Sequence, residues 1–154
     1  MPMETLHPNV RIVWVLQALV GTVLVGGILL ALDTYVLGVG PWVLAVAAVL
    51  ALLGAAHALA RYSVWRFVVD DDGLYLERGV ITRVVTSVPF VRVQHVDTQR
   101  GPVQRLVGLA SVVVYTAGSR GADVTIPGLA PERAEELRER LRELAIESEH
   151  EDAV

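Results

Sequence analysis

The sequence contains no cysteine and no lysine, and both absences limit what the protein can do. Without cysteine there can be no disulfide, thiolate metal site or cysteine nucleophile. All 13 basic residues are arginine and 17 residues are acidic, so the net charge of −4 argues against a general affinity for nucleic acid. The sequence also lacks a glycine-rich phosphate loop, a Gly-x-Ser-x-Gly turn and a metal-spaced histidine pair. We therefore expect no catalytic residue, no cofactor and no metal site.

Hydrophobic residues make up 53% of the chain, and their excess is concentrated before residue 61. Residues 12–32 contain no charged side chain, and residues 41–60 form a second apolar run. Each run is long enough, at about 1.5 Å per helical residue, to cross the hydrocarbon core of a bilayer. The pattern predicts a two-helix transmembrane hairpin within residues 1–61. A cleaved signal peptide is the alternative for the first run, although its apolar stretch is long and a second run follows closely.

Arginines beside the two runs predict how the hairpin is oriented. Arg11 precedes the first run, and Arg61 and Arg66 follow the second, whereas the connecting loop contains Asp33 and no arginine. Because loops rich in positive charge stay on the cytoplasmic side, we expect a multi-pass protein of the cell membrane. Both termini and the residues after the hairpin would then lie in the cytoplasm.

Small residues recur at every fourth position in both predicted spans, which places them on one face of each helix. They are Ala18, Thr22 and Gly26 in the first span and Ala47, Ala51 and Ala55 in the second. Two interpretations stay open: the rows pack against each other inside the hairpin, or they form a seam for self-association. His57 lies near the end of its span, and we expect it to be structural or interfacial and not part of a proton pathway.

After residue 61 the pattern changes to short runs of β-branched and aromatic residues separated by turn residues such as Asp72 and Gly73. An amphipathic helix is predicted over residues 132–146, with Pro131 at its start and with Ala134, Leu137, Leu141 and Leu144 as the apolar positions at helical spacing. The acidic residues 147–154 are expected to be disordered. Strands are predicted over residues 62–69, 74–78, 80–88, 91–97, 111–116 and 123–126.

Several segments of this second part resemble a known family. They are Val88–Asp97, Gln99–Ala110, Tyr115–Gly118 and Ile126–Leu129, and they resemble the YdbS-like bacterial pleckstrin-homology (PH) domain family of membrane proteins. The resemblance covers residues 10 to 146. It implies a membrane α-helical hairpin followed by an α+β PH-like domain over residues 62–146. That domain would be an antiparallel, partly open β-barrel of about seven strands capped by a C-terminal helix. Since one strand is missing from the predicted set, we expect it to be short or hidden near Gln99–Val107.

Basic residues in and around these segments form a candidate interaction surface for anionic lipid headgroups or acidic protein segments. The surface would consist of Arg83, Arg92, His95, Arg100 and Arg105, provided that they converge. His95 can share a strand face with Asp97, which would suit pH sensing or ligand contact. The alternative is a structural histidine that hydrogen-bonds the backbone.

The sequence therefore leads to a membrane-anchored, non-catalytic interaction module that presents a cytoplasmic PH-like domain to proteins or lipids. The alternative is a structural subunit of a homo-oligomer, or of a complex with a membrane protein of the same family. An enzyme is the third hypothesis, and the absence of any catalytic constellation disfavours it.

Overall fold

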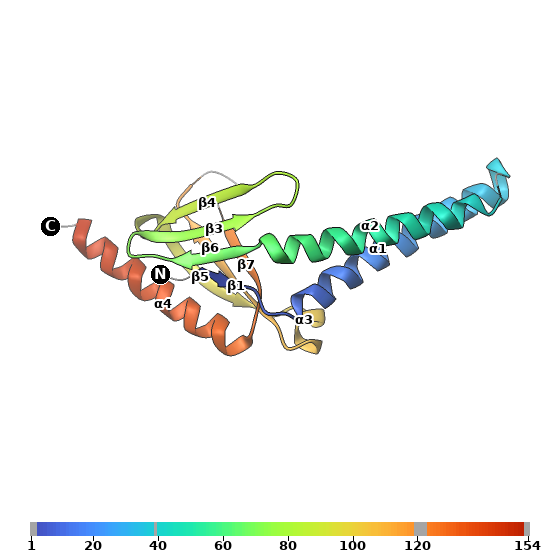
Figure 1. The fold of residues 1–154 in the computed structure, drawn as a ribbon. Coiled ribbons are helices and arrows are strands. Elements are labelled where there is room, and N and C mark those ends of the chain that lie inside the picture. The colour runs from blue at the N-terminus through green and yellow to red at the C-terminus, as the bar shows by residue number, and fades with distance from the viewer. Residues whose placement is uncertain (1–2, 39, 119–122, 153–154) are drawn as a thin grey trace. The chain divides into compact units, whose positions relative to one another are not determined.

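The computed structural model describes residues 3–38, 40–118 and 123–152, and the chain divides into two compact units (Figure 1). Residues 11–63 make a helical hairpin, whereas residues 1–10 and 64–154 together make a sheet domain. This division differs from the predicted one, in which all residues up to 61 belonged to the hairpin. The segment before the first helix belongs to the sheet domain instead.

The hairpin consists of α1 (Val10–Leu32), a π-helical turn η1 (Asp33–Leu37) and α2 (Trp42–Val64). Both α1 and α2 are long and apolar enough to cross a membrane, and most of their large apolar side chains are exposed. Such helices can be stable in lipid because all of their backbone hydrogen bonds are made within the helix. The predicted strand over residues 62–69 begins only at Arg66, since α2 continues to Val64.

The turn between α1 and α2 is closed by the one acidic residue of the hairpin. The buried Asp33 carboxylate accepts the backbone N–H of Gly40, with both oxygens 3.2 Å from the nitrogen. The N–H of Gly38 donates to the backbone carbonyl of Asp33 at 2.8 Å. Gly38 has a φ of 60°, a left-handed conformation that glycine adopts without strain. The acidic residue between the two apolar runs therefore has a structural role in the turn.

The small-residue rows predicted from the sequence lie on the facing sides of α1 and α2. A Cβ placed on Gly26 would stand 3.3 Å from the Cβ of Ala47, and one on Gly54 would stand 3.1 Å from that of Ala18. Larger side chains would hold the two backbones apart. All six row residues are half-buried, in keeping with contacts inside the hairpin: Ala18, Thr22, Gly26, Ala47, Ala51 and Ala55.

The sheet domain contains two antiparallel sheets in its described residues, with strand orders β1-β2-β3-β4 and β5-β6-β7. A 3-10 turn η2 joins the sheets, a short helix α3 separates β5 from β6, and helix α4 follows β7 (Figure 1). The elements are β1 (Glu4–Thr5), β2 (Arg66–Val69), β3 (Gly73–Arg78), β4 (Val84–Pro89), η2 (Phe90–Arg92), β5 (Val93–Gln99), α3 (Pro102–Leu106), β6 (Ala110–Thr116), β7 (Val124–Leu129) and α4 (Pro131–Asp152).

The seventh strand is β1, ahead of the first helix, so the expectation of a strand hidden near Gln99–Val107 was wrong. That segment holds α3, because Gly101 and Pro102 begin a helix there. Proline suits the first helical position, where its missing N–H is not needed. The side chain of Gln104 accepts the N–H of Gly101 at 3.0 Å and so caps the same end.

Two other predicted boundaries also need correction. Strand β4 begins at Val84, not at residue 80, since Gly79 has a φ of 100° and opens a loop there. Helix α4 continues to Asp152, so residues 147–152 are helical and not disordered. The acidic run contains neither proline nor glycine, the residues that most readily end a helix.

The core of the domain lies between the sheets and α4, which packs on β5, β6 and η2. Helix α4 buries an apolar stripe of Ala134, Leu137, Leu141 and Ala145, at the spacing that keeps side chains on one face. Burying each leucine side chain contributes about 1.5–3 kcal/mol to folding. The strands contribute further fully buried residues to the core, among them Leu74, Leu76, Val112, Val114 and Ile126.

The two sheets are not joined into one continuous hydrogen-bonded barrel within the described residues. One backbone bond ties the N-terminal segment to the second sheet, since the N–H of His7 donates to the carbonyl of Gly128 in β7 at 2.7 Å. The segment that carries β1 therefore contacts both sheets before α1 begins.

Candidate functional site

Strand register gives the sheet domain two distinct ends. At the first, called the proximal end, Thr5 lies opposite Arg66, Arg66 opposite Glu77, and Arg78 opposite Val84. The chain leaves the domain for α1 and returns from α2 at this end, and the β3–β4 loop lies at the same end. At the other, called the distal end, Gly73 lies opposite Pro89, next to the β2–β3 turn and η2.

Helix α3 also lies at the proximal end. The side-chain amide of Asn9 donates to the carbonyl of Val107 at 3.2 Å, so the residue after α3 is held beside the start of α1. In the second sheet, Ala110 pairs with Leu129, and Gly128 accepts the bond from His7. The proximal end therefore brings together α3, the β3–β4 loop and both connections of the chain.

The five residues of the predicted interaction surface do not converge on one site. Arg92 and Arg100 flank opposite ends of β5, whose seven residues extend over roughly 20 Å. Arg92 belongs to the distal end, whereas Arg83, Arg100 and Arg105 belong to the proximal end, in the β3–β4 loop and around α3. His95 lies on β5 between them.

His95 does contact Asp97, with the imidazole Nε2 2.8 Å from a carboxylate oxygen. Its ring also lies beside that of Tyr115, with the ring centroids 5.8 Å apart. Both side chains of the pair remain substantially exposed. The contact corresponds to the strand-face pairing that was one of the two alternatives for His95.

His95 and Asp97 line an open groove of about 380 Å³ between β5 and α4. Helix α4 contributes Arg138, Arg142 and Glu149 to the same groove. The groove therefore offers donors and acceptors of both signs, which suits a peptide segment better than a ligand of a single charge. The α4 arginines were not predicted as site residues, because they lie in a strongly acidic helix and the sequence does not show that this helix packs beside β5.

Arg138 carries an unsatisfied donor in this groove. One of its terminal nitrogens lies 2.6 Å from a Glu135 carboxylate oxygen. Its Nε, however, is buried without a hydrogen-bond acceptor among the described residues. A buried N–H without an acceptor costs about 1–3 kcal/mol, and a carbonyl or carboxylate of a bound segment would relieve that cost.

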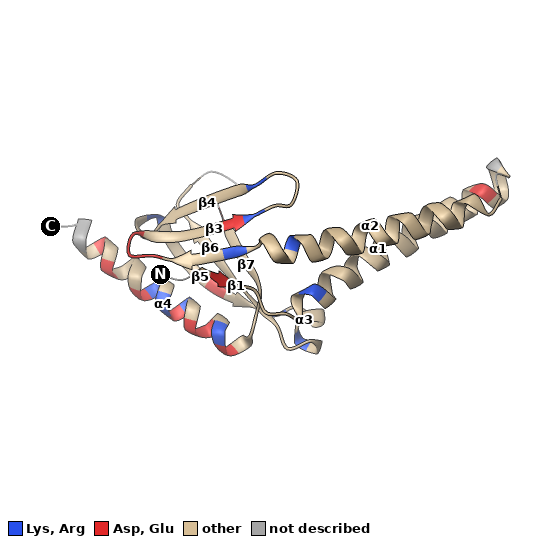
Figure 2. Ribbon diagram, viewed as in Figure 1, with Lys and Arg blue, Asp and Glu red and all other residues tan. Residues whose placement is uncertain are grey.

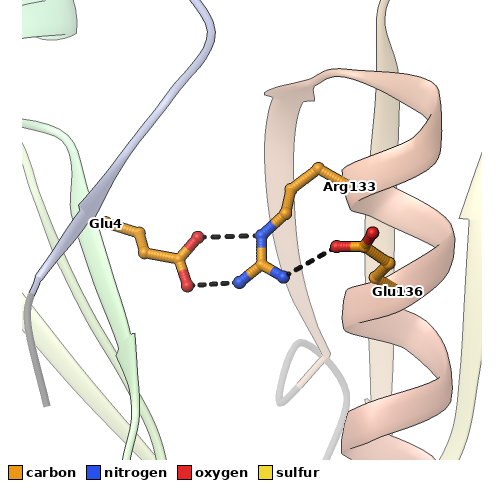
Figure 3. A network of polar contacts seen from close by, with 3 residues as sticks. All are labelled: Glu4, Arg133 and Glu136. Carbon is orange, nitrogen blue, oxygen red and sulfur yellow. Dashed lines mark hydrogen bonds and ion pairs between the residues drawn. The ribbon is translucent and has the colours of Figure 1, made fainter.

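Arg133 fastens the N-terminal strand to α4 (Figure 3). Its Nε donates to Glu4 at 3.0 Å, a second nitrogen contacts the other oxygen of the same carboxylate, and a third contact reaches Glu136 at 3.2 Å. The hydrogen bond to Glu4 is the main cause that raises the pKa of Arg133 above its usual value. Nothing in the sequence singles out Glu4, because its partner lies at the far end of the chain.

Two arginine–aromatic pairs lie at the charged end of the helical hairpin. The guanidinium of Arg11 lies 4.9 Å from the ring centre of Tyr62, and that of Arg61 lies 4.2 Å from the Trp14 ring. Each pair joins the start of α1 to the end of α2. Arginine and aromatic side chains favour the boundary between lipid and water, where a guanidinium can contact both a ring and headgroups.

Among the residues that the structure describes, no group of three or more histidine, aspartate or glutamate side chains is arranged to hold a metal ion. The polar features of the domain are instead a mixed groove and an arginine-rich end, both of which suit binding.

Comparisons with known proteins agree with this architecture. A family model described as Bacterial PH domain matches residues 13–145, so the chain belongs to the bacterial PH domain family. Its sequence is 33% identical over 153 residues to the UPF0699 transmembrane protein YdbS of Bacillus subtilis (strain 168), covering 94% of this chain and 93% of that protein. No solved structure matches the chain. The predicted family is thereby confirmed, and the protein is membrane-associated with a PH-like domain.

Proposed function

We propose that this protein is a membrane-anchored, non-catalytic interaction module that presents its PH-like domain to proteins or lipids at the cell membrane. The pairing of β1 with β2 is the observation that supports this most directly, because these strands immediately flank the two apolar helices. Trp65 alone separates α2 from β2, so the domain follows the second apolar helix directly in the chain. Holding a domain at the bilayer raises its effective concentration toward membrane partners.

In this proposal both apolar helices cross the cell membrane, with both termini and the PH-like domain in the cytoplasm. The arginine–aromatic pairs at one end of the hairpin and Asp33 at its turn support that orientation. The absence of native cysteine makes a direct test simple. In intact cells a membrane-impermeant maleimide should label Thr34→Cys, in the turn, and should label Asp71→Cys only after permeabilisation. The opposite labelling would contradict the orientation.

The groove between β5 and α4 is the proposed contact site for a protein partner. The unsatisfied Nε of Arg138 and the nearby Arg142 supply donors for backbone carbonyls or acidic side chains. The test is purification of the full-length protein from native membranes in mild detergent, followed by mass spectrometry of what co-purifies. A stoichiometric protein should be lost from the Arg138→Ala/Arg142→Ala variant.

Arg140→Ala is the control, because it removes an arginine from an exposed position of the same helix without changing a residue that lines the groove. The control should retain the partner. Retention of the partner by both variants would exclude the groove as the contact site. Loss of the partner from both variants would mean that the charge of α4, and not the groove, determines binding.

A structural subunit is a second candidate function, supported by two polar side chains in the hairpin. In the antiparallel hairpin, Gly54 lies close to Ala18 and the Arg61 guanidinium lies over the Trp14 ring. Gln17 and His57 are therefore at nearly the same position along the hairpin axis, and both side chains are exposed. Polar side chains on a lipid-facing helix surface favour hydrogen bonding to another helix. If this pair drives assembly, Gln17→Leu/His57→Leu should convert an oligomer to a monomer on sizing in mild detergent. A wild-type monomer, or an unchanged oligomer, would refute it.

A further inference from the structure

Two apolar side chains of the sheet domain are almost fully exposed. Ile81, in the β3–β4 loop, is 91% exposed and Leu106, on α3, is 86% exposed, the highest values for large hydrophobic residues among the domain residues described. Val103 on α3 is also exposed. Isolated exposed apolar residues are common, but these belong to two separate segments that lie at the same end of the domain.

Both segments lie at the proximal end, as the contacts around each of them show. The β3–β4 loop follows the pair Arg78–Val84, beside the strand that leads out of α2. The bond from Asn9 to Val107 holds α3 next to the start of α1. If α1 and α2 cross a membrane, as proposed above, Ile81 and Leu106 lie at the end of the sheet domain from which the chain enters and leaves the lipid.

Arginines accompany both apolar residues. Arg83 follows Ile81 in the loop and is 75% exposed even though it contacts Glu77 at 3.3 Å, and Arg105 precedes Leu106 on α3 and is exposed. The distal end has the opposite character, since Asp70, Asp71 and Asp72 form the β2–β3 turn. Figure 2 shows this polarity, with blue at both ends of the β3–β4 loop and red at the β2–β3 turn.

The basic and acidic ends of the domain are far enough apart to interact separately with a charged surface. The six residues of β3 extend over roughly 20 Å, which exceeds the screening length of about 8 Å at physiological salt. A negatively charged surface at the proximal end would therefore attract the nearby arginines and would scarcely repel the distal aspartates. Apolar tips beside arginines are the side-chain combination that favours the headgroup region of a bilayer.

We propose that the proximal end of the domain is a bilayer-contact face. Ile81 and Leu106 enter the headgroup region of an anionic phospholipid bilayer, while Arg83 and Arg105 contact lipid phosphates. This inference rests on the proposed membrane anchoring and specifies which surface of the module meets lipid. A bilayer is favoured over a protein partner here because the chain enters lipid at this same end, so lipid is an obligatory neighbour.

The test uses the full-length protein, whose lack of cysteine allows one fluorescent probe to be attached at one chosen residue. Single cysteines replace Ile81, Leu106 or Val91, and the labelled proteins are reconstituted into phosphatidylcholine vesicles with or without phosphatidylglycerol. Val91 is the matched control, since it is an exposed apolar residue at the distal end. Lipid-borne quenchers should quench probes at Ile81 and Leu106 several-fold more than the probe at Val91, and more strongly with phosphatidylglycerol present.

Charge reversal tests the arginines separately. Each arginine near an anionic surface contributes about fivefold to partitioning onto that surface. Arg83→Glu/Arg105→Glu should therefore lower the ratio of bilayer-docked to undocked domain by about 25-fold or more. The variant should also lose the additional quenching that phosphatidylglycerol causes. Arg92→Glu, a single charge reversal at the distal end, should leave quenching unchanged, whereas Arg83→Glu alone should lower it. Equal effects of single reversals at Arg83 and Arg92 would overturn the assignment of the face.

A probe at Leu24→Cys, in the middle of α1, separates failure of this inference from failure of the anchoring itself. Quenching at Leu24 by lipid, with Ile81 and Leu106 reached only by aqueous iodide, would overturn the contact face and leave the anchor intact. Absence of lipid quenching at Leu24 would overturn both. Protection of Ile81 and Leu106 from iodide without lipid quenching would also overturn the lipid assignment, in favour of protein contact.

Discussion

The junction between the sheet domain and α1 depends on a glycine that a single methyl group should disrupt. Gly128 in β7 has a φ of 64°, and a Cβ placed on it would stand 2.6 Å from the Cβ of Val10 and closer still to one of its methyl groups. Val10 is buried, so it has little room to move. Gly128→Ala should therefore destabilise the domain through backbone strain of about 1–2 kcal/mol and a steric clash of about 1–3 kcal/mol.

Gly108→Ala provides the matched control for that substitution. Gly108 has a similar φ of 68°, but a Cβ there would have no neighbour within 4 Å. Gly108→Ala should lower the free energy of unfolding only through backbone strain, by about 1–2 kcal/mol. The free energy of unfolding can be measured by pulse proteolysis of the full chain in mild detergent across a urea series.

The difference between the two variants is the quantity that matters. We expect Gly128→Ala to be less stable than Gly108→Ala by about 1–3 kcal/mol. Adding Val10→Ala to Gly128→Ala should restore only part of the loss, because it removes the nearest methyl groups but keeps the Cβ. Equal destabilisation by the two alanine substitutions would refute the close packing of the N-terminal segment on β7.

Three further sets of substitutions test the packing. Leu141→Ala, in the fully buried stripe of α4, should lower the free energy of unfolding by about 2–5 kcal/mol on urea denaturation, and a loss under 1 kcal/mol would contradict its place in the core. Glu4→Gln and Arg133→Gln should each destabilise by at most about 1 kcal/mol, since the pair is more than a third exposed, and additive effects in a double-mutant cycle would show that the pair is not coupled. Gly54→Leu should separate α1 from α2 at Ala18, whereas Gly21→Leu should not, because a Cβ at Gly21 has no neighbour within 4 Å. Cross-linking between cysteines introduced into α1 and α2 measures this separation, and an equal loss of cross-linking in both variants would refute the prediction.

The features that could be predicted from the sequence are those set by local pattern. Two long apolar runs give α1 and α2, because hydrophobicity over a membrane thickness needs no knowledge of distant residues. The α4 stripe follows from helical spacing: Ala134, Leu137 and Leu141 are fully buried, as predicted, although the fourth predicted position, Leu144, is only half-buried. Ala145 occupies the stripe instead, since the drift of 3.6 residues per turn shifts the contact by one position.

The features that were missed depend on contacts between distant parts of the chain. Strand β1 consists of only Glu4 and Thr5, and its partner β2 follows both apolar helices. No run of two residues carries a strand signal, and its pairing is favoured only once α1 and α2 have brought the two segments together. The predicted convergence of the basic residues on one surface is absent for a similar reason. Neighbours in sequence such as Arg92 and Arg100 are separated by the length of β5, and only the register shows it.

The same register implies that the two proposed contact surfaces do not compete. The bilayer-contact face occupies the proximal end, whereas the groove uses His95 near the start of β5 and Arg142 in the second half of α4, toward the distal end. Anchoring has already removed most of the translational freedom that lipid contact would otherwise cost, so a few arginines and two apolar tips suffice to dock the face. A protein held in the groove would leave Arg83 and Arg105 free to contact lipid. The effects of Arg83→Glu/Arg105→Glu on lipid quenching and of Arg138→Ala/Arg142→Ala on partner recovery should therefore be independent, and strong coupling would mean that a partner spans both surfaces.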